Sequence, residues 1–326
     1  MRVLFIHSGN AVGGDSSKYT FVREQGAALN AATISDECLG IRDEKIDVGY
    51  FAVVGKGVCG YLRNVMPLRK KIMEFRPDIV HAHFGLCGMV VVLAAKKKVP
   101  VVITCHNGET LSRSANIITS LALQRADYTI CVAQHIYDKL YLKPKHYLIQ
   151  PCGIDLKDLP LVDKDSAMRE MNLPKDKINI LFGGLFSNAR KNAPLAQAAI
   201  ALLHRDDINL IEMHGFNRKQ VNLLFCGCDM LLLSTKSEGS PQVLKEAMAC
   251  NCPVVATDVA DIAYLLQGVT NSYLTSFDPK DVADKIQRVI DCGERTNGRE
   301  RIETLKLDNP QVARRIIQIY EQILNA

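Results

Sequence analysis

Two glutamates, Glu238 and Glu246, lie eight positions apart, and Gly239, Ser240 and Pro241 follow the first of them. Ser240 is a good helix N-cap and Pro241 suits a first helical turn, so we expect a helix to begin there. Glu238 then lies in the loop before the helix, and Glu246 lies about two turns along it. The free N–H groups of a helix start favour an anion, and Gly239 lets backbone approach a ligand closely. These residue types suit a phosphate at the helix start and a hydroxyl-rich ligand held by the two carboxylates.

Length and composition place this segment in a large globular protein. The chain has 326 residues, 48% of them apolar and 23% charged, which predicts two domains of ordinary size. The net charge is +5, with small basic clusters at 69–71 and 96–98. Solvated helix faces are the simplest explanation of these clusters, and contact with anionic lipid headgroups is the alternative. Nucleic acid is not an expected partner, because no recognised binding motif accompanies the charge.

The cysteines indicate the compartment. The chain has 11 cysteines, several inside apolar runs, and none forms a C-x-x-C motif. Cys226/Cys228 and Cys250/Cys252 are C-x-C pairs without histidines at zinc-like spacing, so no metal site is expected. We expect reduced thiols and a cytoplasmic protein. The chain start turns polar after four apolar residues, which predicts a first strand instead of a signal peptide, and the apolar run at 88–95 is too short to span a bilayer.

Short apolar runs alternate with amphipathic stretches along the whole chain, which predicts parallel sheets covered on both faces by helices. Strands are expected at 2–7, 33–38, 48–54, 78–83, 99–104, 128–132, 147–150, 178–184, 208–213, 229–233 and 254–256. Helices are expected from a cap at 16 or 17 to 29, at 61–75, up to 97, and at 112–125, 193–204, 219–225, 241–250, 281–291 and 310–324. The segment 151–164 is the candidate hinge. The fold class is therefore α/β, with a first domain at 1–158, a second domain at 159–307 and a last helix within 308–326 that we expect to pack back on the first.

In such sheets ligands lie beyond the carboxyl ends of the strands. That rule selects the loop with Gly13 and Gly14, the strand ends at His83 and His106, the loop 183–191 and the loop at Glu238. We expect these segments to converge on one cleft between the two domains.

The string 237–249 resembles the E-x7-E segment of retaining glycosyltransferases of family 4, which have the GT-B fold. From spacing alone, a capped surface helix with two solvated glutamates would be the simpler interpretation. The resemblance implies two Rossmann-like domains facing a central cleft. It also implies that Glu246 holds the ribose of a donor and that Glu238 faces the transferred sugar and takes part in catalysis, with further contacts from Gly239, Ser240, Pro241 and Gln242.

Four other segments are similar to motifs of that family. Thr104-Cys105-His106 is similar to the T-x-H segment, which implies that the catalytic His106 contacts the transferred sugar. The pair Arg190-Lys191 is similar to the basic pair that neutralises the donor pyrophosphate. Gly13-Gly14 is similar to the loop against the donor phosphates and the acceptor, and His214-Gly215-Phe216 follows the strand that flanks the base. As isolated features, these residues would be a structural histidine, two exposed cations and ordinary turns.

The chain also departs from the family pattern. Asn107-Gly108-Glu109 replaces the commoner H-G-S-D sequence, so an acceptor contact from Glu109 does not follow. Gly184-Leu185 stands where many members have Gly-Arg. One phosphate-binding arginine is therefore missing, and Arg190, Lys191 and the helix start at Pro241 carry more of the phosphate charge.

The resemblance implies a retaining, metal-independent hexosyltransferase without a cofactor, which uses a nucleotide-diphosphate sugar of the UDP or GDP type. Its expected acceptor is a glycan or lipid-linked glycan in cell-surface polysaccharide assembly, with a cytoplasmic enzyme lying at the inner face of the membrane. Two alternatives stay open. A nucleotide-sugar epimerase on the same fold would need no acceptor, and a non-catalytic sugar-nucleotide-binding protein would fit Leu185 and the shortened second domain.

Overall fold

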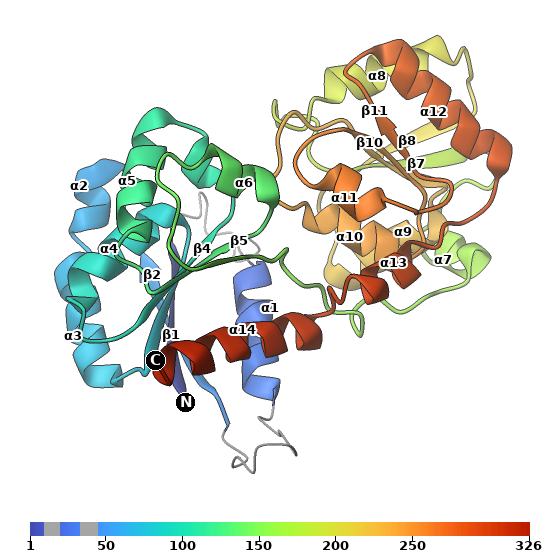
Figure 1. The fold of residues 1–326 in the computed structure, drawn as a ribbon. Helices are drawn as coiled ribbons and strands as arrows, with labels where there is room; N and C mark the ends of the chain where they lie inside the picture. Colours follow the sequence, from blue (N-terminus) through green and yellow to red (C-terminus); the bar gives the residue numbers. More distant parts are fainter. Residues whose placement is uncertain (10–19, 33–44) are drawn as a thin grey trace. The chain divides into compact units, whose positions relative to one another are not determined.

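The computed structural model describes residues 1–9, 20–32 and 45–326 of the chain. It forms two compact units, the first made of Met1–Gly153 with Asn309–Ala326 and the second of Ile154–Asp308 (Figure 1). Each unit is a parallel sheet with helices on both faces, which confirms the predicted α/β class. The sequence predicts boundaries after 158 and 307. The structure divides the chain after 153 and 308 because the Ile154 amide donates to the Leu307 carbonyl, 3.0 Å away, within the second unit.

The first unit has a six-stranded sheet in the order β2-β1-β3-β4-β5-β6, and every pair in it is parallel. The central strands β3 and β4 are buried along their whole length, as expected of strands covered on both faces, although β3 contains His81 and His83. The strands are β1 (Arg2–Ser8), β2 (Asp47–Val53), β3 (Ile79–His83), β4 (Val101–Cys105), β5 (Tyr128–Cys131) and β6 (Tyr147–Ile149).

Helices cover the two faces of this sheet with separate cores. Phe5 and Val102 belong to one core together with Ile316 and Tyr320 of α14, and Leu4 and Ile103 belong to the other. The last helix therefore supplies part of the first unit's core. The helices are α1 (Thr20–Ala31), α2 (Gly57–Leu62), α3 (Val65–Phe75), α4 (Gly85–Ala95), the 3₁₀ turn η1 (Gly108–Thr110), α5 (Arg113–Leu123), α6 (Gln134–Lys139) and α14 (Asn309–Leu324).

The second unit has a five-stranded parallel sheet in the order β11-β10-β9-β7-β8. One face packs on α8 and α12 and the other on α7, α9, α10, α11 and α13. Its elements are α7 (Lys164–Glu170), β7 (Ile178–Phe182), α8 (Ala193–Leu202), β8 (Ile208–Glu212), α9 (Arg218–Gly227), β9 (Met230–Leu233), α10 (Gln242–Ala249), β10 (Val254–Thr257), α11 (Ile262–Leu266), β11 (Tyr273–Thr275), α12 (Pro279–Cys292) and α13 (Gly298–Thr304).

The structure corrects one helix. The stretch predicted as a single helix at 61–75 is divided into α2 and α3, with a break at Asn64. The Asn64 amide donates to the Val54, Gly60 and Tyr61 carbonyls, and Pro67 is tolerated because it falls in the first turn of α3. The predicted strand at 33–38 and the predicted cap at 16 or 17 lie outside the described residues.

Two findings bear on the predicted setting. In the part of the chain that the structure describes, no helix is both long and apolar enough to cross a membrane. The ten described cysteines are free thiols, seven of them buried.

Candidate active site

The first glutamate of the E-x7-E segment forms an ion pair with the lysine of the basic pair. Lys191 Nζ lies 2.7 Å from Glu238 Oε1, and the two side chains are 13% and 9% exposed. Thr235 Oγ1 donates to the same carboxylate oxygen at 3.0 Å. Because both charges are largely removed from water, each one stabilises the other in the absence of a ligand. The structure thus brings together two residues that are 47 positions apart in the sequence.

Residues that follow β9 form hydrogen bonds with the loop that carries Lys191. Ser234 Oγ donates to the Lys191 carbonyl at 3.0 Å, and the Lys236 amide donates to the Arg190 carbonyl at 2.8 Å. Gly184 makes room for the lysine, since a Cβ at that position would lie 2.7 Å from Lys191 Cγ. Sequence reasoning missed Ser234 and Thr235, although their position directly after a buried strand could have indicated them.

The second glutamate is paired with an arginine that sequence reasoning did not select. Arg218 Nη1 lies 2.5 Å from Glu246 Oε1, and the glutamate is 8% exposed. Arg218 opens α9, whose start is fixed by a capping box between Asn217 and Gln220. The N-x-x-Q spacing signals the helix start, but nothing in the sequence links Arg218 to Glu246.

The start of α10 differs from the prediction. Pro241 is the N-cap residue in an extended conformation, and the helix begins at Gln242. Ser240, expected as the cap, makes no capping hydrogen bond, and its hydroxyl is buried without a partner of normal geometry in the described structure. Ser240 therefore lies one residue further from the helix than its type suggests.

Asp261 is a second charged residue that sequence reasoning missed. It precedes α11, is 7% exposed, and its two carboxylate oxygens have no hydrogen-bond partner of normal geometry among the described residues. Burial raises the pKa of this carboxyl to about 6, while the Lys245 ammonium and the Ser240 hydroxyl oppose the rise and the charge of Glu238 adds to it. Asp261 therefore lies beside the Glu238 loop and changes its charge near neutral pH.

His106 lies in the first unit, at the end of β4. Its Nε2 is 3.2 Å from His83 Nδ1 and its Nδ1 is 3.8 Å from Cys152 Sγ, so both ring nitrogens face polar side chains. Burial lowers the pKa of His83 far below the usual value, with further lowering from His81 and His7, so His83 is neutral. The neutral ring of His83 fixes the orientation of His106 without adding a charge.

The two turns that carry these histidines have unusual backbone angles. Phe84, directly after His83, has φ +77°, and Asn107, directly after His106, has φ +98°. For a bulky residue such as Phe84 this is a strained conformation, of the kind that clusters at functional sites. Glu109 is buried, and its carboxylate accepts the Gly85 amide at 2.9 Å and the His106 amide at 3.0 Å, so it holds the two turns together.

Most of the remaining predicted site residues are exposed or half-buried. Arg190 is exposed, His214 and Gly215 are exposed, and Phe216 packs partly against the core of the second unit. Leu185 is 37% exposed, and Gly239 and Gln242 are half-buried. Gly13 and Gly14 lie outside the described residues. No group of three His, Cys, Asp or Glu side chains in the described ranges is arranged to hold a metal ion.

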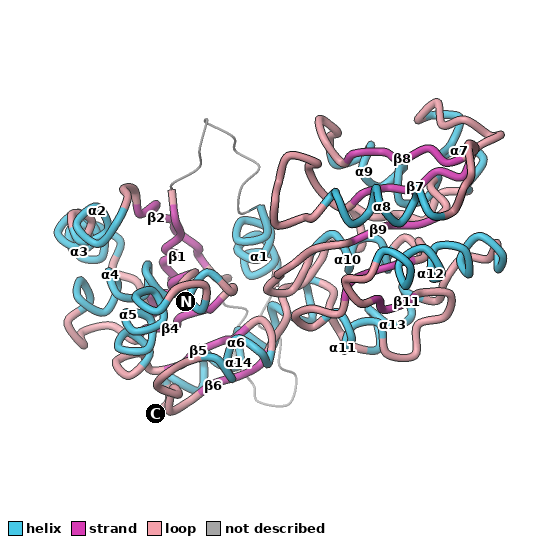
Figure 2. The backbone as a smooth tube through the Cα atoms, turned by 90° about the horizontal axis from the view of Figure 1, so that it is seen from above, coloured by secondary structure: helices cyan, strands magenta, loops and turns pink. Residues whose placement is uncertain are grey.

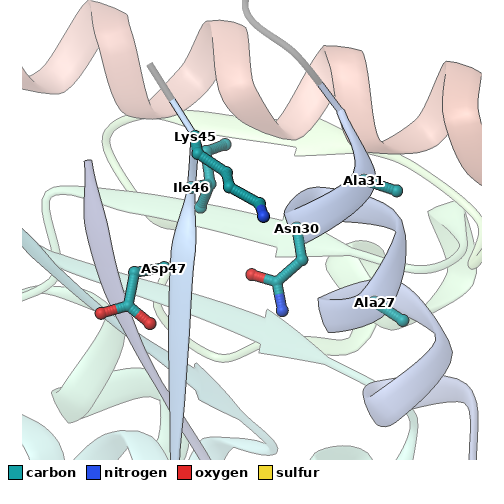
Figure 3. Close-up of a pocket in the computed structure, with 6 residues that line it drawn as sticks. All are labelled: Ala27, Asn30, Ala31, Lys45, Ile46 and Asp47. Atoms are coloured by element: carbon teal, nitrogen blue, oxygen red, sulfur yellow. The ribbon is translucent and has the colours of Figure 1, made fainter.

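A cavity of about 660 Å³ lies elsewhere, between the end of α1 and the start of β2 (Figure 3). Its lining residues are Ala27, Asn30, Ala31, Lys45, Ile46 and Asp47. The cavity is at the amino end of β2, whereas ligands of open α/β sheets lie at the carboxyl ends. None of the predicted site residues lines it, so it is not part of the candidate site.

Two family models match the chain. The model of Glycosyltransferase Family 4 matches residues 31–158, and the model of Glycosyl transferases group 1 matches residues 174–292. Together they cover more than half of the chain, which is therefore a glycosyltransferase. It belongs to the family 4 type of these enzymes and has the GT-B fold.

Curated relatives are remote. An uncharacterised glycosyltransferase of Methanocaldococcus jannaschii is 24% identical over 268 residues, which are 72% of this chain and 72% of the relative. The D-inositol 3-phosphate glycosyltransferase of Actinosynnema mirum is 23% identical over 71% of this chain and 68% of its own length.

Solved structures share the fold over nearly the whole chain. Sucrose-phosphate synthase from Thermosynechococcus elongatus matches with a TM-score of 0.79 at 18% identity and covers 99% of both chains. The Anabaena protein HepE in complex with UDP and glucose matches with a TM-score of 0.73 at 17% identity and covers 98% of this chain and 99% of its own. At this identity the likeness defines the fold.

The buried Asp261 predicts a pH dependence of stability. An acid whose pKa rises on folding binds more protons in the folded state, so its contribution to stability falls as pH rises from 3.8 to about 6. Asp261→Asn should remove this fall and raise the free energy of unfolding at neutral pH by roughly 1–3 kcal/mol. Urea denaturation at several pH values measures both effects, with the exposed neighbour Asp258→Asn as control. If the stability of the Asp261→Asn variant depended on pH as that of the parent does, a raised pKa of Asp261 in the folded protein would be contradicted.

Proposed function

We propose that the protein is a retaining, metal-independent glycosyltransferase that transfers a sugar from a nucleotide-diphosphate sugar, of the UDP or GDP type. The observation that carries the proposal is the ion pair between Lys191 and Glu238. A diphosphate has the charge to take Lys191 from Glu238, and the released carboxylate can then accept hydrogen bonds from sugar hydroxyls. The similarity of the fold to that of HepE, which was solved in complex with UDP and glucose, supports a nucleotide-sugar donor.

The donor nucleoside would bind through the second pair. Glu246 accepts hydrogen bonds from the ribose hydroxyls while Arg218 orients its carboxylate. The segment His214-Gly215-Phe216 precedes Asn217, the N-cap of α9, and flanks the base. The exposed Arg190 and the backbone amides at the start of α10 add to the positive potential at the diphosphate.

In the proposed reaction the bond between the sugar and the diphosphate breaks as the acceptor hydroxyl approaches from the same face. Positive charge develops on the ring, as in glycoside chemistry generally, and the departing diphosphate gathers negative charge. Lys191, Arg190 and the start of α10 stabilise that charge, so no metal or other cofactor is required. A phosphate oxygen takes the proton of the acceptor hydroxyl, and His106 contacts the transferred sugar.

The acceptor we propose is a glycan or lipid-linked glycan of cell-surface polysaccharide assembly, with the enzyme at the inner face of the membrane. The name of the Actinosynnema relative, an inositol-phosphate glycosyltransferase, supports a hydroxyl acceptor in general. The family membership supports transfer of a hexose.

The experiment that tests the function is a donor screen on the full chain in the presence of a chelator. We expect one UDP- or GDP-sugar to raise the melting temperature and to be hydrolysed slowly or transferred, with the anomeric configuration retained in the product. Interconversion of two donors without an acceptor would identify an epimerase. Binding of a donor without any turnover would identify a sugar-nucleotide-binding protein, and loss of activity with the chelator would contradict metal independence.

Glu246→Ala should weaken donor binding by about 1–3 kcal/mol, because the ribose loses hydrogen bonds to a charged acceptor. Isothermal titration with the donor selected by the screen measures the change, and Glu246→Gln, which keeps the shape, should show a smaller loss. The exposed Glu300→Ala in the same unit serves as control. Parent affinity in both Glu246 variants would rule out the ribose assignment.

His106→Ala should lower turnover on the order of 100-fold with little change in donor affinity, because its contact with the sugar matters most as charge develops. Steady-state kinetics and donor titration separate the two quantities. The exposed His146→Ala in the same unit is the matched control. A variant with the turnover of the parent would make His106 a structural residue.

A further inference from the structure

Three segments of the first unit, 52–73, 84–100 and 110–126, carry basic residues that no acidic residue within them balances. They contain ten Lys and Arg residues and no Asp or Glu. The other 30 basic residues of the chain are outnumbered by its 35 acidic ones, so the rest of the chain is negative and the net charge of +5 depends on these segments. The cations are Lys56, Arg63, Arg69, Lys70, Lys71, Lys96, Lys97, Lys98, Arg113 and Arg125.

The fold assembles the three segments into one layer. They contain α2, most of α3, α4 and α5, which contact one another in the order α2 or α3, α4, α5 and lie together in both views (Figure 1 and Figure 2). Arg69 joins the basic clusters at 69–71 and 96–98, since it donates to the Leu93 and Ala94 carbonyls at 3.0 and 3.4 Å. Lys70 has a carboxylate 3.8 Å away, on Glu74 in the last turn of α3. We name this layer the α2–α5 face.

The central helix of this face has no polar side. All residues of α4 are apolar or glycine, yet Leu86, Met89 and Val92 remain half-exposed on its outer side. An outer helix of a globular protein normally presents polar residues to water. The outer side of α4 instead forms the floor of an apolar cavity of about 210 Å³, walled by Val58 and Leu62 of α2 and by residues of α5.

Large apolar side chains project around this cavity among the cations. Val58 and Leu62 on its rim are 58% and 43% exposed, and Met66 and Leu111 are both 65% exposed. Ile117 and Leu121 extend the apolar surface along α5. Scattered single apolar residues need no explanation, but a cluster over an apolar cavity marks an interaction site.

We propose that the α2–α5 face docks on the surface of a bilayer that contains anionic lipids. Its cations attract the headgroups, and Val58, Leu62, Met66 and Leu111 enter the acyl boundary beside the cavity. A nucleic acid would match the charge, but single-strand binding needs stacked aromatic rings, and Tyr61 is the aromatic residue at the cavity. The inference deepens the proposed position at the membrane, and it is independent of the donor and the reaction.

The test is flotation of the full chain with vesicles of phosphatidylcholine, with and without phosphatidylglycerol. We expect binding to the anionic vesicles, weakened by salt. Arg63→Glu with Arg113→Glu should lower binding about tenfold or more, and Leu62→Ser with Met66→Ser should lower it while leaving the charge unchanged. All four side chains are exposed, so the variants should fold and bind donor like the parent.

The matched control is Arg314→Glu with Leu324→Ser on α14, which covers the opposite face of the sheet. It should bind vesicles like the parent. The inference is overturned if the parent does not bind anionic vesicles, if the control loses as much binding as the test variants, or if the serine variant binds like the parent. Because vesicle binding is measured without donor, its failure leaves the proposed reaction intact, and an inactive protein that binds vesicles leaves the docking surface intact.

Discussion

The ion pair of Lys191 and Glu238 is the constraint around which the second unit's strand ends are arranged. Two opposite charges that are both nearly buried must meet with good geometry, since either one alone would be costly in that position. The contacts of Ser234, Thr235 and Gly184 all serve this geometry. In the proposed reaction, the positive charge is thus already in place before the donor arrives, and little reorganisation is needed when the leaving group forms.

Much of the fold can be predicted from the sequence, because its strands are short apolar runs separated by amphipathic stretches. The strands β7 and β9, Ile178–Phe182 and Met230–Leu233, are examples of such mainly apolar runs. The helix break at Asn64 could not be predicted in the same way, because it depends on a hydrogen bond to Val54, ten residues earlier. The prediction that Ser240 caps α10 was wrong. Serine suits that role by its residue type, but Pro241 is the N-cap residue and has the extended conformation before α10.

The site is less predictable than the fold. The motif residues Glu238, Glu246, His106 and Lys191 can be selected from the sequence, and their roles remain predictions. Arg218 and Asp261 could not be selected, because each approaches the motif only through tertiary structure. The sequence places His83 at the end of a strand, and the structure adds its contact with His106. The pairing of Glu238 with Lys191 and of Glu246 with Arg218 therefore depends on the tertiary structure.

The chain leaves the first unit after Gly153 and returns to it at Asn309, and these two residues are close, since a Cβ on Gly153 would lie 2.5 Å from Asn309 Oδ1. The second unit is thus inserted into the first between adjacent ends. During synthesis, all residues of the inserted unit are made before α14, whereas the first sheet lacks Ile316 and Tyr320 on one face until α14 follows. The core on that face of the first sheet can therefore be completed only after the whole second unit has been synthesised.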